Sequence, residues 1–145
     1  MKNTTKGTHL IVTGFVFPDK VGLLNDSEAL GSLLVELVHL VGMKPLTEPQ
    51  FVAVPLDEGQ ADSTDDCGGV TGFIILSTSH ISVHTWPLHR RVSLDLYSCH
   101  TFDPDLVLEF LRLRLGLCGA NIVELDRTPP ADPESGFQFR VLSFT

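Results

Sequence analysis

The residues from Ser79 to Pro87 read Ser-His-Ile-Ser-Val-His-Thr-Trp-Pro, and Cys99 lies twenty positions after Ser79. This part of the chain combines a hydroxyl, imidazoles and a thiol, the side-chain groups used in nucleophilic and acid–base catalysis. A chain of 145 residues has little room for an elaborate active site, so these groups are the first candidates for chemistry.

Period-two alternation predicts strands on both sides of this site. From His80 to Thr85 the histidines and Ser82 fall on one face, and the other side chains fall on the opposite face. The segment Arg91–Ser98 alternates in the same way, and Cys99 continues one of its faces. The pattern changes at residues 77–79, which predicts a turn or a strained junction there.

Further strands are expected where apolar or β-branched residues cluster between turn signals. They are His9–Phe17, Gln50–Leu56, Val70–Leu76, Ile122–Leu125 and Phe137–Phe144. Val70–Leu76 shows no alternation, which predicts a strand buried on both faces.

Two helices are indicated by apolar residues at helical spacing and by capping signals. The first is expected to begin at Asn25, with Glu28 as capping-box partner, and to end at Gly42. The second is expected to begin at Asp103-Pro104 and to span Leu106–Leu117. The order of elements predicts one α+β domain over residues 1–145, a two-layer sandwich with a largely antiparallel sheet and helices on one face.

Composition limits the possible partners. The formal net charge of −8 argues against nucleic acid and anionic membranes and favours a cationic ligand. No apolar run is long enough to span a bilayer. The three cysteines Cys67, Cys99 and Cys118 lack a framework spacing, which predicts free thiols and a cytoplasmic location. Four of the histidines (His80, His84, His89 and His100) lack zinc-site spacing, so no metal is expected.

The run from Ser79 to Pro87, with Cys99 beyond it, closely resembles the self-cleaving serine segment of the prokaryotic S-adenosylmethionine decarboxylases. These are small pyruvoyl enzymes of polyamine (spermidine) biosynthesis. The specific resemblance extends from about Gly69 to Cys99. It implies that the chain is a zymogen that cuts itself between Thr78 and Ser79, and that Ser79 becomes a covalent pyruvoyl group that binds the substrate amine as a Schiff base.

The resemblance also implies a role for each candidate residue. His84 would be the base that removes the α-proton of Ser79, and Thr71 would supply a hydroxyl to the oxyanion during processing. Cys99 would return a proton after carbon dioxide has left. The family usually has serine at the position of Thr71 and glutamate at that of Thr78.

Two departures affect substrate recognition. Leu88 stands where the family has a glutamate that binds the ribose hydroxyls, and Asp65 stands where it has an aromatic ring that stacks on adenine. Asp65 and Asp66 lie in an acidic stretch that could bind a distal cation. These departures favour a decarboxylase of L-ornithine (giving putrescine) or L-arginine, in which Leu88 closes the ribose space.

Two alternatives remain open. One is S-adenosylmethionine decarboxylase itself, which acts on a cationic sulfonium substrate. The other is an unprocessed, non-catalytic regulatory homologue. The resemblance further implies a homo-oligomer of processed protomers with its active site near a subunit interface.

Overall fold

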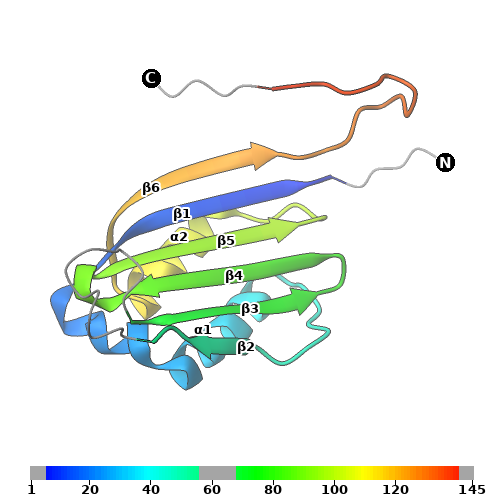
Figure 1. The fold of residues 1–145 in the computed structure, drawn as a ribbon. Helices are drawn as coiled ribbons and strands as arrows, with labels where there is room; N and C mark the ends of the chain where they lie inside the picture. The colour runs from blue at the N-terminus through cyan, green and yellow to red at the C-terminus, as the bar shows by residue number, and fades with distance from the viewer. Residues whose placement is uncertain (1–5, 56–67, 141–145) are drawn as a thin grey trace.

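The computed structural model describes residues 6–55 and 68–140, and within them the fold is α+β (Figure 1). Six strands form one sheet in the order β2-β3-β4-β5-β1-β6, and every neighbouring pair is antiparallel. The strands are β1 Thr8–Val16, β2 Gln50–Ala53, β3 Val70–Leu76, β4 Ser79–Trp86, β5 Arg91–Ser98 and β6 Leu117–Asp126. The predicted two-layer architecture is confirmed.

Two α-helices, α1 Ser27–Leu40 and α2 Pro104–Arg114, pack against one face of the sheet. Alternate strand residues such as Leu10, Ile81 and Leu96 are fully buried against the helices. The opposite face has no described element over it (Figure 1). None of the described helices is long and apolar enough to cross a membrane.

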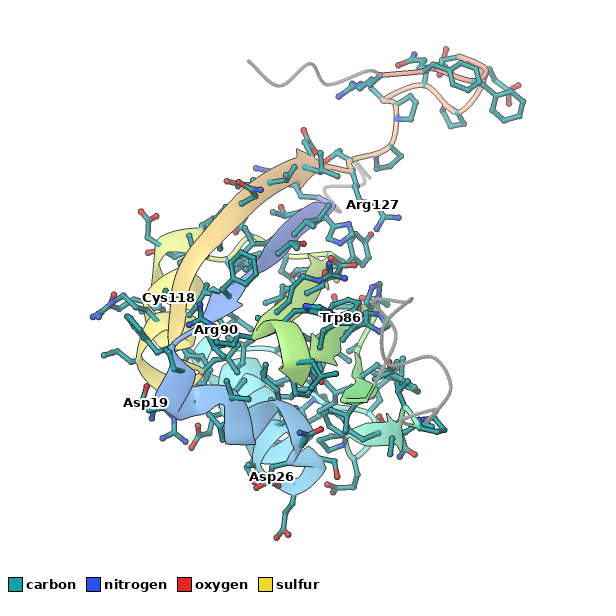
Figure 2. All side chains as sticks on the ribbon, turned by 60° about the vertical axis from the view of Figure 1, so that its left-hand side comes forward. Asp19, Asp26, Trp86, Arg90, Cys118 and Arg127 are labelled. Atoms are coloured by element: carbon teal, nitrogen blue, oxygen red, sulfur yellow. The ribbon has the colours of Figure 1, made fainter. Side chains whose placement is uncertain are left out.

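The start of α1 differs from the prediction. Residues Pro18–Asn25 form a short 3-10 helix, η1, and Asp26, not Asn25, caps α1 at its junction with η1 (Figure 2). The Asp26 carboxylate accepts a hydrogen bond of 3.0 Å from the Ala29 amide. A carboxylate satisfies a free amide of the first turn and also interacts favourably with the helix dipole, so Asp26 is the stronger cap. The predicted cap of α2 is confirmed, because Asp103 accepts a bond from the Asp105 amide.

The prediction that β3 is buried on both faces is wrong. Its side chains alternate in burial, and Phe73 and Ile75 are 42% and 38% exposed on the open face. The expected strand at Ile122–Leu125 is part of the longer β6. The expected strand at Phe137–Phe144 is not formed in its described part: residues 137–140 are unpaired, and Phe137 and Phe139 are almost fully exposed.

Thr85 joins the sheet to the segment that precedes α1. Its hydroxyl, on a side chain only 3% exposed, accepts a 2.8 Å bond from the Val70 amide and donates a 2.7 Å bond to the Leu24 carbonyl. Gly69 has a φ of +85°, and a Cβ there would collide with the Thr85 backbone. The threonine of the His-Thr-Trp-Pro run is therefore a structural residue that fixes the start of β3 against β4.

We expect Thr85→Val to lower the free energy of unfolding by about 2–4 kcal/mol, because it leaves a buried amide and a buried carbonyl unpaired. Urea unfolding followed by circular dichroism measures this change. Thr85→Ser keeps the hydroxyl and is the matched control, for which we expect most of the stability to remain. A Thr85→Val protein as stable as wild type would contradict the structural role of this hydroxyl.

Candidate active site

The turn between β3 and β4 contains the peptide bond expected to be cleaved. Leu76 pairs with Ser79, so only Ser77 and Thr78 form the connection. Thr78 has a φ of +60°, a left-handed conformation that glycine adopts readily and a β-branched residue adopts only under strain. Such strain is of the order of 1–3 kcal/mol. The predicted strained junction lies directly before Ser79.

Ser79 and Cys99 are neighbours at this end of the sheet. The Ser79 hydroxyl accepts a 3.1 Å bond from the Cys99 amide and lies 3.6 Å from the Cys99 sulfur, to which it donates. Both residues are nearly buried, with 7% and 8% of their surfaces exposed. Ser79 and Cys99, the serine and the thiol that lie twenty positions apart in the sequence, are thus in contact.

Thr78 makes the shortest contact with the thiol. Its hydroxyl oxygen lies 2.7 Å from the Cys99 sulfur and 2.7 Å from the Ser77 carbonyl oxygen. Hydrogen bonds from the hydroxyl of Thr78, and then from that of Ser79, hold the pKa of the Cys99 thiol below its ordinary value, and burial opposes this effect. From the sequence, Thr78 was expected only to be the residue before the cleaved peptide bond, and its contact with Cys99 was not predicted.

Thr71 and His84 form a second group. They are cross-strand partners on the open face, and the Thr71 hydroxyl lies 3.1 Å from Nδ1 of His84. His84 is five residues from Ser79 along β4, a separation of about 16 Å at 3.3 Å per residue. Figure 1 shows that the start of β3 and the end of β4 lie at the opposite end of the sheet from the β3–β4 turn. One chain therefore does not bring His84 to Ser79.

Of the residues expected to bind the substrate, only Leu88 lies within the described part of the chain, and it lies at the end of the sheet that bears His84. Leu88 lies in the short 3-10 helix η2, Pro87–His89, directly after β4, and is 63% exposed. Nearby, the Arg91 guanidinium lies 4.0 Å from the centroid of the Trp86 ring, whose position Figure 2 shows. Asp65, Asp66 and Cys67 lie outside the described residues.

A ring cluster on the open face beside the Ser79 end was missed by sequence reasoning. The Tyr97 ring lies 5.6 Å from the His80 ring and 6.1 Å from the His9 ring, and the Arg127 guanidinium lies 4.4 Å from its centroid. The Asp95 side chain is 40% exposed on the same face, 3.9 Å from His9. Alternation placed Tyr97 and Cys99 on one face, but the pairing of β5 with β1 cannot be read from alternation.

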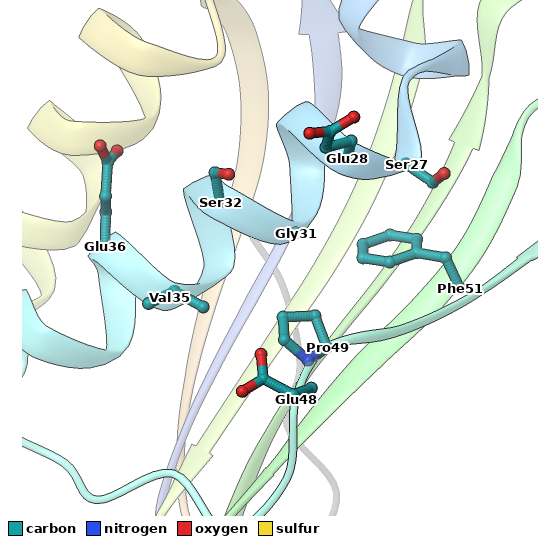
Figure 3. Close-up of a pocket in the computed structure, with 9 residues that line it drawn as sticks. All are labelled: Ser27, Glu28, Gly31, Ser32, Val35, Glu36, Glu48, Pro49 and Phe51. Carbon is teal, nitrogen blue, oxygen red and sulfur yellow. The ribbon is translucent and has the colours of Figure 1, made fainter.

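A cavity of about 480 Å³ lies on the helix side, between α1 and β2 (Figure 3). Phe51 and Pro49 face Gly31 of α1, and Glu28 and Glu48 lie at its margins. Of the expected site residues that the structure describes, none lines this cavity, so we do not assign the chemistry to it. Among the described residues, no group of three histidine, cysteine, aspartate or glutamate side chains could hold a metal ion.

Comparison with known proteins gives one consistent family. A sequence profile of the S-adenosylmethionine decarboxylase family matches residues 8–128. The S-adenosylmethionine decarboxylase proenzyme of Pyrococcus abyssi is 35% identical over 132 residues, which cover 90% of this chain and 85% of that protein. The corresponding proenzyme of Geobacillus sp. strain WCH70 is 37% identical over 59 residues, and the chain spans about half (48%) of its length.

The fold has a solved counterpart. The crystal structure of the adenosylmethionine decarboxylase from Aquifex aeolicus superimposes with a TM-score of 0.64, over 92% of this chain and 98% of that one. At 23% identity this likeness supports the fold alone. Since the profile spans most of the chain and the Pyrococcus protein matches nearly its full length, the chain belongs to the S-adenosylmethionine decarboxylase family.

Proposed function

We propose that this chain is the proenzyme of a pyruvoyl-dependent S-adenosylmethionine decarboxylase that cleaves itself between Thr78 and Ser79. The family is one of pyruvoyl-dependent carboxy-lyases, made as proenzymes whose serine supplies the pyruvoyl group. The observation that carries the proposal is the strained Thr78 backbone joined to a serine whose hydroxyl touches the Cys99 sulfur.

Self-cleavage would begin with attack of the Ser79 hydroxyl oxygen on the Thr78 carbonyl carbon. The amide C–N bond breaks, and an ester joins the two residues. Removal of the Ser79 α-proton then expels Thr78 as a carboxylate and leaves dehydroalanine, which hydrolyses with loss of ammonia to the pyruvoyl group. The Ser79 hydroxyl is already oriented for its part, because the Cys99 amide donates to it and the Cys99 sulfur accepts from it.

The residues at this end of the sheet fit a pyruvoyl group at position 79. That group supplies a carbonyl that binds the substrate amine and withdraws electrons as carbon dioxide leaves. Cys99 is the protonatable group in contact with Ser79, so its thiol is the candidate for returning the proton to the substrate carbon. Its burial limits access of bulk water to the same carbon.

The Thr71–His84 pair supports assembly of two copies. A base must lie within hydrogen-bonding reach of its proton, and about 16 Å of strand separates His84 from Ser79 in one chain. A two-fold pair of chains can place one end of a sheet opposite the other end of its partner. We propose that His84 and Thr71 of one copy serve Ser79 of the second copy in a homo-oligomer.

S-adenosylmethionine is the proposed substrate, in place of the L-ornithine or L-arginine favoured by the sequence, because the relatives support this alternative better. The matched relatives are S-adenosylmethionine decarboxylase proenzymes. Leu88 lies at the His84 end of the sheet, which the proposed assembly would place beside Ser79 of the second copy, so the acceptor missing at this position must be supplied by other residues. The Tyr97 and His80 rings offer an aromatic surface on the open face at the end of the sheet where β4 begins, and Asp95 offers an acceptor for hydroxyl groups.

We expect purified protein to separate under denaturing conditions into residues 1–78 and residues 79–145, the latter with an N-terminal pyruvoyl group. Intact-mass spectrometry measures both. Ser79→Ala should stay intact because no nucleophile remains. Cys99→Ala is the matched comparison, which should still cleave, but more slowly because the acceptor beside the Ser79 hydroxyl is gone, and should lose most turnover. A wild-type chain that stays intact on prolonged incubation would instead indicate a non-catalytic regulatory homologue.

We expect complementation between two inactive chains. His84→Ala and Ser79→Ala should each stay intact when expressed alone. In co-expression, the His84→Ala chain keeps its serine and should be cleaved by the His84 of its Ser79→Ala partner. Affinity tags of different mass identify which chain is cut. Co-expression of His84→Ala with a chain carrying both substitutions is the control and should give no cleavage.

Cleavage of His84→Ala on its own would show that His84 is not the base. No cleavage in the mixed sample, with both chains folded and associated, would contradict the sharing of sites between copies.

We expect carbon dioxide release from S-adenosylmethionine and none above background from L-ornithine or L-arginine at equal concentration. The Ser79→Ala protein sets the background for each compound. The physical basis is the ring cluster and the Asp95 carboxylate on the open face at the same end of the sheet as Ser79, which suit a nucleoside better than an aliphatic chain. Turnover of either amino acid without turnover of the nucleoside would reverse this assignment.

A further inference from the structure

The Thr78 hydroxyl sits between two acceptors and has a single hydrogen to give. Its oxygen is 2.7 Å from the Ser77 carbonyl oxygen and 2.7 Å from the Cys99 sulfur. When the hydroxyl donates to the carbonyl, the sulfur must donate to the hydroxyl, and Cys99 is a thiol. When the sulfur is a thiolate, the hydroxyl must turn and donate to it. The position of this one hydrogen therefore follows the protonation state of Cys99.

We infer that Thr78 is a positioning residue that sets the protonation of Cys99, in opposite directions before and after self-cleavage. Before cleavage its hydroxyl stabilises the sulfur as a proton acceptor. After cleavage the carboxylate created on Thr78 stabilises the same sulfur as a protonated thiol. Only the second half of the inference, on the cleaved chain, rests on the proposed function. The first half rests on contacts that the structure shows in the uncleaved chain.

The first half follows from the groups that face the sulfur. The β3–β4 turn presents the Thr78 hydroxyl and the Ser77 carbonyl, and β4 presents the Ser79 hydroxyl. The hydroxyls lower the pKa of Cys99, and no charged side chain of the described residues contributes to this shift. The exposed His100 follows Cys99 in the sequence, and the half-buried His80, whose ring lies against Tyr97, follows Ser79.

The second half follows from the atoms that cleavage changes. The Thr78 carbonyl carbon loses its bond to nitrogen and ends as a carboxylate with one negative charge. The Ser79 hydroxyl disappears when residue 79 becomes pyruvoyl, so the sulfur loses one donor. A like charge within about 4–6 Å disfavours a thiolate and raises the pKa of the thiol. Cleavage thus removes the Ser79 donor and adds an anion to the turn that touches the sulfur, while the Thr78 hydroxyl remains.

This change suits the two reactions in sequence. During processing, the Ser79 hydroxyl must lose its proton, and the sulfur to which it donates at 3.6 Å is the adjacent acceptor. During decarboxylation, a proton must move from the enzyme to the substrate carbon, which requires a protonated thiol. The same cysteine can serve both steps because cleavage reverses its surroundings.

The pKa of Cys99 can be measured from the pH dependence of its alkylation by iodoacetamide, with each cysteine peptide followed by mass spectrometry. The exposed Cys118 in the same sample is an internal control. The uncleaved reference is Ser79→Ala. It also lacks the serine hydroxyl, so its comparison with the cleaved wild-type protein isolates the effect of the new carboxylate and pyruvoyl.

In the Ser79→Ala background we expect Thr78→Val to raise the pKa of Cys99 by about one unit. At a pH below the pKa, this lowers the thiolate fraction of Cys99 roughly tenfold. Valine keeps the branched shape, and Thr78→Ser should restore the lower value. Cleaved wild-type protein should show a higher pKa than Ser79→Ala, while Cys118 should be unchanged throughout. If Thr78→Val does not fold, Thr78→Gly removes the same hydroxyl with a relaxed backbone.

An unchanged Cys99 profile in the folded Thr78→Val protein would overturn the first half. A pKa in the cleaved protein equal to or below that of Ser79→Ala would overturn the second half. Failure of the proposed function gives a different result: wild-type protein that never cleaves, with the Thr78 effect still measurable in the uncleaved chain.

Discussion

The register between β3, β4 and β5 is the constraint on which the candidate site depends. Leu76 pairs with Ser79 across a two-residue turn, and Ile81 pairs with Leu96 on the other side of β4. A slip of one residue would move every side chain of β4 to the opposite face. The register is held by completely buried residues such as Ile81 and by the Thr85 hydroxyl, not by the groups that carry chemistry. The core therefore determines that Ser79 meets Cys99.

The same register separates the site into two halves. Once Ser79 is fixed at the start of β4, His84 must lie five residues away on the open face, paired with Thr71. No rotamer of either side chain crosses that distance along an extended strand. The open face of the sheet bears His84 near one end, and the Tyr97 ring cluster lies at the other end because Tyr97 pairs with His80 at the start of β4. A second sheet laid over this face in the opposite direction would bring the two halves together.

Sequence patterns correctly predicted those parts of the fold that are set by residues close together in the chain. The bounds of β5, the cap of α2 at Asp103 and the turn before Ser79 follow from alternation, from a capping side chain and from the change of pattern. The burial of β3 was mispredicted because Phe73 and Ile75 are apolar yet exposed in one chain, as expected of a surface that another element covers.

The candidate site was predictable as a set of residues and not as an arrangement. Spacing and resemblance proposed Ser79, His84 and Cys99 as candidates, but strand order brings β1 and its His9 beside β5, and spacing contains no strand order. The role of Thr78 depends on a distance of 2.7 Å across a turn. The preference for an amino-acid substrate has less support than its alternative for a related reason: an absent contact says little until the residues that replace it are placed.

The left-handed conformation of Thr78 also limits what strain can do for self-cleavage. A strained ground state lowers the barrier only by the strain that the transition state releases, at most about 1–3 kcal/mol here. That amount corresponds to roughly a 5-fold to 160-fold gain in rate. Glycine at this position would remove most of the strain, yet it would also remove the hydroxyl that contacts the Cys99 sulfur. Because orientation and proton transfer must supply the rest of the acceleration, the side chain of Thr78 matters at least as much as its backbone strain.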